Sequence, residues 1–213
     1  RYYVFGELSK KLYRETWIPD MAIVPVGSFG SNDEDFQRIL EGQSDDIAIL
    51  AGCFMRLPEF IEIIRALAIA FPKRTIWIQV HLGYLKLPHS REFLDKCTLG
   101  LENVVHSTKP LTSVFEITRF AFSDPSTAIL EAIQFGLDAF FIDIAPYHES
   151  TILRSYEGLC VNSAEEAIER IKLIESKKWI YPRGKFADLV NITGNSIFDA
   201  LRKDLKLPGP ATQ

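Results

Sequence analysis

The sequence lacks the features that mark several classes of protein. It has only 3 cysteines among 213 residues, and no two stand at the C-x-x-C spacing, which excludes a small scaffold stapled by disulfides. The longest mainly apolar stretch, residues 61–71, falls far short of the ~20 residues that a membrane-crossing helix needs. Because the three cysteines are odd in number and widely spaced, we expect Cys53, Cys97 and Cys160 to be free thiols, buried or partly buried, in a reducing compartment.

An excess of positive charge is also missing. The chain carries 24 Lys and Arg against 28 Asp and Glu, a net charge of −4, and has no run rich in Lys and Arg. It therefore lacks the electrostatic footprint of a general nucleic-acid binder, and we expect no nucleic-acid partner. The motifs G-x-G-x-x-G, G-x-x-x-x-G-K-[ST] and G-x-S-x-G are absent, and the four histidines show no metal-ligand spacing. We expect neither a metal nor another cofactor.

What the sequence does contain is an alternation of short apolar runs and helical periods. Near-continuous apolar runs are typical of parallel strands that are covered on both faces. The expected strands are residues 22–26, 47–50, 75–80, 103–106, 120–123, 139–144 and 159–161. The expected helices are residues 58–70, 91–99, 111–119, 126–135, 148–155 and 164–176. This pattern predicts an α/β fold: a Rossmann-like, mostly parallel open sheet with helices on both faces.

The two ends of the chain fit the alternation poorly. Residues 1–20 are expected to be an interdomain connection or the tail of a missing N-terminal domain, with a helix over 8–17, because the chain opens on Arg1 with a strand-like segment. Residues 21–182 are expected to form the Rossmann-like domain. Residues 183–213 are expected to form a C-terminal helix and a frayed tail.

The residues that follow each strand are the candidates for chemistry, because ligands bind at the carboxyl ends of parallel strands. After the strand at 120–123 come Asp124, Pro125, Ser126 and Thr127. If Asp124 caps the next helix and Pro125 takes its first position, then free N–H groups and two hydroxyls lie at the helix start, where they could hold a phosphate. An ordinary helix start explains the same residues.

His81 ends the strand at 75–80 and would lie on the same sheet edge as Ser126 and Thr127. Its imidazole could stabilise a developing phosphate charge, or it could be bonded to a neighbouring carbonyl with a purely structural role. Glu131, one helical turn beyond Thr127, could point to the same pocket or to solvent.

The run 122–142 resembles the donor-binding signature of the GT-B glycosyltransferases, in which a strand leads into S-[ST]-x-x-x-E-A-x-x-x-G and then into another buried strand. Residues 72–81 resemble the strand that ends in the family's His-Pro element, known from bacterial enzymes that use CMP-sugars and from CDP-glycerol transferases. Here His81 is followed by Leu82 instead of Pro, so UDP- or GDP-sugars stay open. Residues 4–7 and 23–28 are similar to the passage that leads into the family's C-terminal half.

The resemblance implies the donor-nucleotide half of a glycosyltransferase that transfers a sugar from a nucleotide-sugar to a surface-polysaccharide or glycolipid acceptor. It implies His81 as the catalytic residue beside the leaving phosphate. It implies that the nucleotide-sugar is held, without a metal, by Gly27, Ser28, Ser126, Thr127 and Glu131.

The resemblance also implies partners and a location. The acceptor would reach this chain through a missing N-terminal domain or subunit, so whether the chain is itself an enzyme stays open. A cytoplasmic location follows, with at most peripheral association at the inner face of the membrane. Two other functions remain: a non-catalytic Rossmann-like module that binds a nucleotide or a protein, and a sugar-nucleotide epimerase.

Overall fold

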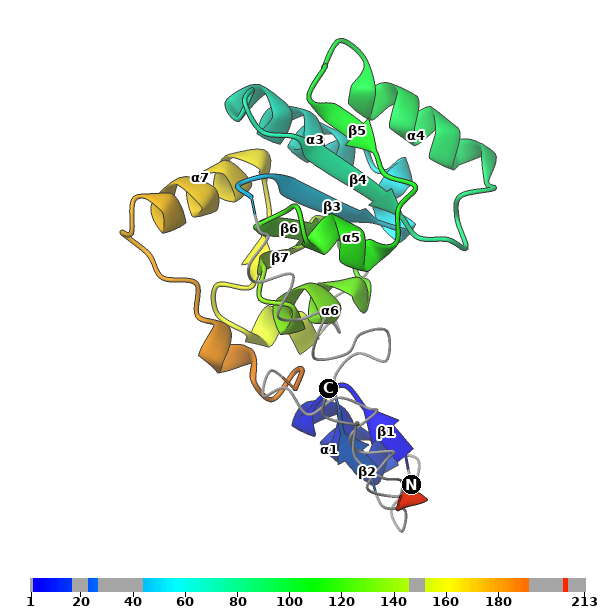
Figure 1. Cartoon of the computed structure of the whole chain (residues 1–213), viewed down its shortest axis with the longest axis vertical. Helices are drawn as coiled ribbons and strands as arrows, with labels where there is room; N and C mark the ends of the chain where they lie inside the picture. Colours follow the sequence, from blue (N-terminus) through cyan, green and yellow to red (C-terminus); the bar gives the residue numbers. More distant parts are fainter. Residues whose placement is uncertain (1, 17–22, 27–43, 146–151, 192–204, 207–213) are drawn as a thin grey trace, which may run out of the picture.

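The main body is a six-stranded parallel sheet with the strand order β5-β4-β3-β6-β7-β8 (Figure 1). The computed structural model describes residues 2–16, 23–26, 44–145, 152–191 and 205–206. The strands are β3 (Ile47–Ala51), β4 (Ile76–Val80), β5 (Val104–His106), β6 (Phe120–Ser123), β7 (Asp138–Ile142) and β8 (Cys160–Val161). Every pairing in this sheet is parallel, which confirms the predicted fold class.

The chain reverses its direction of travel across the sheet between β3 and β6. From β3 it proceeds to β4 and β5 on one side, and it then returns to β6 and proceeds to β7 and β8 on the other. In open α/β sheets the crevice beyond the carboxyl ends of two such strands is the usual ligand site. The fold therefore directs attention to the residues after β3 and β6.

Helices cover both faces of the sheet, as expected. The helices are α3 (Pro58–Ala70), α4 (Pro88–Thr98), α5 (Leu111–Phe115), α6 (Ala128–Gln134) and α7 (Ala164–Glu175), with the 3-10 turns η1 (Cys53–Arg56), η3 (Ile152–Ser155) and η4 (Arg183–Phe186). α3 packs against both α4 and α7, while α5 and α6 lie on the opposite face (Figure 1). At the start of α7 the side chain of Ser163 accepts a hydrogen bond from the Glu166 N–H, which caps the helix.

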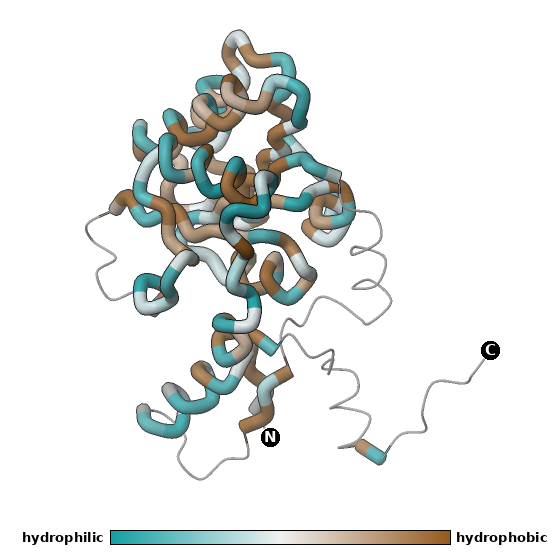
Figure 2. The backbone as a smooth tube through the Cα atoms, turned by 90° about the vertical axis from the view of Figure 1, so that its left-hand side faces the viewer, coloured by the Kyte–Doolittle hydropathy of each residue, from teal (hydrophilic) through white to brown (hydrophobic). Residues whose placement is uncertain are grey.

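The core lies between the sheet and these helices. Every residue of β3 and β6 is buried, which explains why their sequences are apolar runs without alternation. Aromatic rings fill the space beside β6 and β7: Phe140 stacks on Phe122 with ring centroids 5.2 Å apart, and it meets Tyr181 edge-on at 5.5 Å. The Tyr181 hydroxyl donates to the Ala139 carbonyl oxygen at 2.6 Å. Brown, apolar segments accordingly concentrate inside the main body in Figure 2.

The strand expected at residues 22–26 does not join this sheet. It forms β2 (Ile23–Pro25), which pairs in parallel with β1 (Tyr2–Val4) in a separate two-stranded sheet. α1 (Glu7–Thr16) connects the two strands, close to the helix expected over 8–17, and its Leu8 packs against the core.

Several helix boundaries differ from those expected. α4 begins at Pro88 instead of residue 91, because Pro88 fits the first turn of a helix. α5 ends at Phe115, and α6 begins at Ala128, two residues later than expected. Of the helix expected over 148–155, the described part is the 3-10 turn Ile152–Ser155.

The N-terminal unit and the segment after η4 are joined by backbone hydrogen bonds. The Leu8 N–H donates to the Asp188 carbonyl oxygen and the Asn191 N–H donates to the Phe5 carbonyl oxygen, both at 2.8 Å. Gly6 lies between them, and a Cβ at Gly6 would stand 2.5 Å from the Leu189 carbonyl oxygen. Only a glycine permits this close approach.

We expect Gly6→Ala to destabilise the protein by about 1–3 kcal/mol, because the added methyl group meets backbone that cannot rotate away. Unfolding in urea, followed by circular dichroism, measures the loss. Gly184→Ala is the matched control, because a Cβ at Gly184 meets nothing within 4 Å. If the two variants had the same stability, the close approach at Gly6 would be contradicted.

Candidate functional site

A pocket of about 480 Å³ opens at the carboxyl edge of the sheet. Its walls are the ends of β3 and β4, residues 108–111 before and at the start of α5, and Ser126 and Ala128 at the start of α6. His81 and Ser126, which come from distant parts of the sequence, both line it. The structure thus brings together two of the residues predicted to share a site.

The imidazole of His81 is held in one orientation. The His81 backbone N–H donates to the Ala51 carbonyl oxygen at 2.8 Å, which fixes the end of β4 beside β3. The Nδ1 atom accepts a hydrogen bond from the Gly83 N–H at 3.1 Å, and the ring meets Tyr84 edge-on. Because Nδ1 is an acceptor, the neutral ring carries its proton on Nε2. His81 therefore offers the exposed edge of the sheet an N–H donor.

Ser126 lies in the turn before α6. Its Oγ accepts a hydrogen bond from the Ala128 N–H at 3.3 Å, and the hydroxyl proton can still be donated. The next residue, Thr127, is the N-cap of α6, but its side chain makes no capping hydrogen bond. Thr127 is exposed and does not line the pocket.

The remaining predicted site residues are not brought to this pocket. Glu131 is half-buried in α6 and is not among the residues that line it. Gly27 and Ser28 lie outside the described residues.

Asp124 does not cap α6, in contrast to the expectation from its position. The side chain is fully buried, and its Oδ2 accepts hydrogen bonds from the backbone N–H groups of Gly52 at 2.7 Å and Phe54 at 3.0 Å. Burial raises the pKa of this carboxyl group, and the two backbone amides act in the opposite direction. The amide groups after β3, which could otherwise hold an anion, are thus occupied by the chain's own carboxylate.

The thiol of Cys53 lies beside this carboxylate. Its pKa is raised to about 12, first by burial of the sulfur and then by the negative charge and hydrogen bonding of Asp124. All three cysteines are free: Cys97 is buried and Cys160 half-buried as expected, whereas Cys53 is an exposed residue.

Sequence reasoning missed Gln79. The residue lines the pocket, and its Oε1 atom is buried without a hydrogen-bond partner. Gln79 and His81 are two residues apart at the end of β4 and therefore face the same side of the sheet, which was the available signal. Lys109 also lines the pocket, with its ammonium group 5.7 Å from the centre of the Trp77 ring. None of the described residues that line the pocket carries a carboxylate, so the polar groups among them suit an anionic ligand.

Within the described ranges, no three His, Cys, Asp or Glu side chains are grouped in a way that could hold a metal ion. Among the same residues, no helix has both the length and the apolar character required to span a bilayer.

No protein-family model and no curated protein sequence matches this chain. Solved structures do. The wall teichoic acid polymerase TagF superposes with a TM-score of 0.59 at 17% identity, over 96% of this chain and 57% of TagF. A complex of S. aureus MnaA with UDP gives a TM-score of 0.50 at 10% identity, over 96% of this chain and 59% of MnaA.

These similarities establish the fold alone. The chain has the Rossmann-like fold found in GT-B glycosyltransferases, consistent with one half of that architecture. It spans less than two thirds of the length of either protein.

Replacement of Asp124 by Asn should make Cys53 more reactive. The change removes the negative charge beside the sulfur, so the pKa of Cys53 falls, and each unit of decrease raises the thiolate fraction about tenfold at a fixed pH below the pKa. Alkylation by iodoacetamide at mildly alkaline pH, followed by mass spectrometry, measures the rate. Buried Cys97 is the internal control, because faster alkylation of Cys97 as well would show that the fold had opened. If the alkylation rate of Cys53 did not change, the effect of the Asp124 charge on its thiol would be contradicted.

Proposed function

We propose that the chain is the donor-binding half of a glycosyltransferase and that the pocket beside His81 holds the nucleotide part of a nucleotide-sugar. One observation carries the proposal: His81 and Ser126 meet in a pocket at the carboxyl edge, and no carboxylate is among the described residues that line it. Both side chains can donate hydrogen bonds, and a phosphate group needs donors.

In this proposal the two donors act on the leaving phosphate. When the acceptor hydroxyl attacks the anomeric carbon of the sugar, the hydroxyl proton passes to a base or to water. The bond from that carbon to the phosphate oxygen breaks, and the electron pair of that bond stays on the phosphate. Hydrogen bonds from His81 Nε2–H and the Ser126 hydroxyl stabilise this developing charge, and they are stronger in a partly apolar pocket than in water. His81 Nε2–H is preoriented for the task by the bond from Gly83 to Nδ1.

The rest of the pocket suits the nucleoside. Leu50, Val80, Pro110 and Leu111 provide apolar surface for a base or ribose, and the side chain of Gln79 adds an amide group to the wall. These features support a nucleotide-linked donor without selecting one base.

The comparisons support the substrate class without establishing it. TagF is described as a wall teichoic acid polymerase, which suggests a cell-surface polymer or glycolipid as acceptor, and the MnaA structure contains UDP. Among the proposed functions a transferase is favoured over an epimerase, because an epimerase is expected to place more acidic and histidine side chains around its cleft. In the part of the chain that the structure describes, the residues that line this pocket include one histidine and no acid.

Calorimetric titration of the chain with CMP, UDP and GDP tests the proposal and identifies the base. Ser126→Ala and His81→Ala should each weaken nucleotide binding by about ten- to a hundredfold, the equivalent of one lost charge-assisted hydrogen bond of ~1.5–3 kcal/mol. Thr127→Ala should weaken nucleotide binding less than either of these variants, because Thr127 is exposed and does not line the pocket.

Ser176→Ala is the matched control, since Ser176 is exposed beyond the C-terminal end of α7. It should bind like the wild type. If the wild type bound none of the three nucleotides, or if all variants bound equally, the pocket would not be a nucleotide site and a non-catalytic module would be the better description.

A further inference from the structure

The loop between β4 and α4, residues 82–87, exposes an unusual concentration of apolar side chains. Leu82 is 78% exposed, and Leu85 and Leu87 are each 38% exposed. In the described part of the chain, only seven large hydrophobic residues are exposed to this degree, and three of them fall within these six positions. Scattered exposed leucines need no explanation, but a cluster marks an interaction surface.

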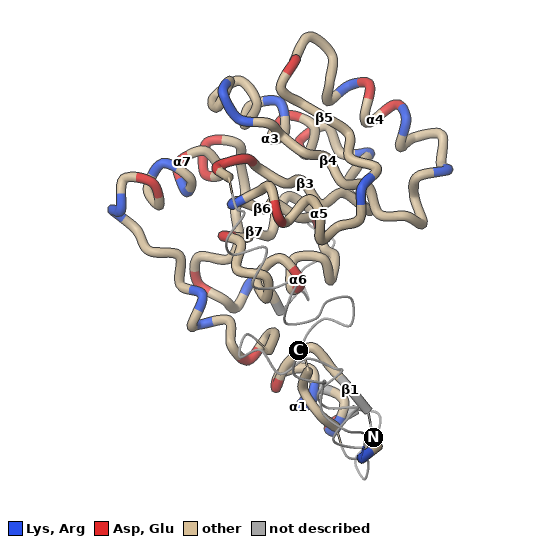
Figure 3. The backbone as a smooth tube through the Cα atoms, in the orientation of Figure 1, with Lys and Arg blue, Asp and Glu red and all other residues tan. Residues whose placement is uncertain are grey.

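The same stretch is locally basic in an acidic protein. Residues 82–91 contain Lys86, Arg91 and His89 but no Asp or Glu, although the chain as a whole has a net charge of −4. Lys86 and Arg91 are both exposed. Figure 3 shows blue but no red along the loop that leads into α4.

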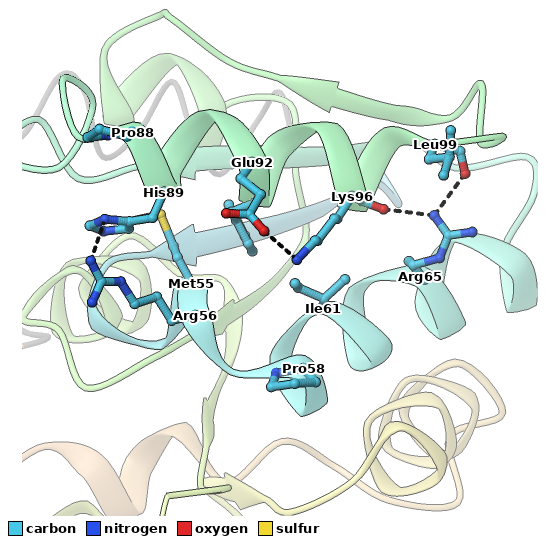
Figure 4. A pocket seen from close by; sticks show the side chains of 11 residues that line it. Met55, Arg56, Pro58, Ile61, Arg65, Pro88, His89, Glu92, Lys96 and Leu99 are labelled. Atoms are coloured by element: carbon cyan, nitrogen blue, oxygen red, sulfur yellow. Dashed lines mark hydrogen bonds and ion pairs between the residues drawn. The ribbon is translucent and has the colours of Figure 1, made fainter.

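A paired arginine and histidine adjoin this loop. Arg56 of η1 and His89 of α4 face each other at one end of a groove of about 810 Å³, with Arg56 Nη2 3.1 Å from His89 Nδ1 (Figure 4). Among the described residues no carboxylate lies within ion-pair distance of Arg56. Glu92, the acid of the groove, pairs with Lys96 at 2.6 Å, and the charge of Arg56 acts on it more weakly. Since His89 Nδ1 accepts from the guanidinium, His89 Nε2 carries a proton. The pair therefore presents only donors, which suits an anion.

We propose that the basic leucine edge, defined as residues 82–91 together with Arg56, docks on an anionic phospholipid bilayer. The leucines enter the interfacial region of the bilayer, while Lys86, Arg91 and the Arg56–His89 pair contact lipid phosphates.

A bilayer fits this edge better than a protein partner does. The loop that carries the leucines projects from the main body between β4 and α4 (Figure 1), and Lys86 stands between Leu85 and Leu87 in the sequence. The positive charge of the edge complements an anionic membrane surface and would be attracted to it. This docking surface is distinct from the nucleotide pocket, but Leu82 belongs to both. Docking would therefore bring the mouth of the pocket close to lipid-linked molecules.

Co-sedimentation of the full chain with vesicles tests the proposal. The wild type should bind equimolar phosphatidylcholine–phosphatidylglycerol vesicles and bind pure phosphatidylcholine vesicles much more weakly. Leu85→Ser/Leu87→Ser should reduce the apparent affinity about tenfold or more, and serine suits position 87, which is the N-cap of α4. Arg56→Ala should reduce it about fivefold on the anionic vesicles only.

Ile180→Ser is the matched control, because Ile180 is 84% exposed and lies outside this edge. It should bind vesicles like the wild type. In a second readout, the tryptophan introduced by Leu85→Trp should shift its emission to shorter wavelength when anionic vesicles are added, whereas that of Ile180→Trp should not. Circular dichroism verifies that each variant is folded.

Several results would overturn the proposal. The wild type could fail to sediment with the anionic vesicles, or Ile180→Ser could lose as much vesicle affinity as the double leucine variant. The chain could also self-associate through the leucines on a sizing column without binding vesicles. Binding of inorganic phosphate at Arg56 without vesicle binding would also overturn it. Nucleotide titration of the Leu85→Ser/Leu87→Ser variant keeps the two proposals separate, because its pocket is intact.

Discussion

The buried carboxylate of Asp124 determines how the carboxyl edge of this sheet is built. It follows β6 and accepts hydrogen bonds from two backbone amides after β3, and it thereby ties together the two strands at which the strand order reverses. A buried carboxylate without such donors would be costly, so the turn after β3 and the strand β6 hold each other in place. Gly52 permits the contact, since a Cβ there would lie 3.2 Å from Asp124 Oδ2.

This interaction decides where a ligand can bind. The amides after β3 are occupied by the chain's own carboxylate, and the open space lies instead toward β4 and the start of α5. Asp124 contacts the turn after β3, α6 begins at Ala128, and Ser126 lies in the turn before α6 and lines the pocket. Burial of the sulfur and, after it, the charge of the same carboxylate raise the pKa of the Cys53 thiol, which makes it a poorer nucleophile. The remaining polar groups, His81, Ser126 and Gln79, are those on which the proposed nucleotide site depends.

The sequence predicts the sheet well and its carboxyl edge less well. Apolar runs such as β3 and β6 reveal buried parallel strands, because burial on both faces leaves no polar position. The segment from Asp124 to Thr127 was predicted as a capped helix start, but the partners of Asp124 lie some 70 residues earlier, and local capping rules contain no information about them. Likewise, periodicity identified β2 as a strand without indicating that it pairs with β1.

The most direct test of the account is a nuclear magnetic resonance titration of the ¹⁵N-labelled chain with the nucleotide that binds most tightly. The account predicts that amide shifts change most at His81 and Ser126 and at Thr108, Lys109 and Leu111 of the pocket wall. The amides of Gly52 and Phe54 stay unchanged, because Asp124 continues to hold them. Large shifts at Gly52 and Phe54, with His81 and Ser126 unaffected, would contradict it, since the phosphate would then have displaced Asp124 from the turn after β3.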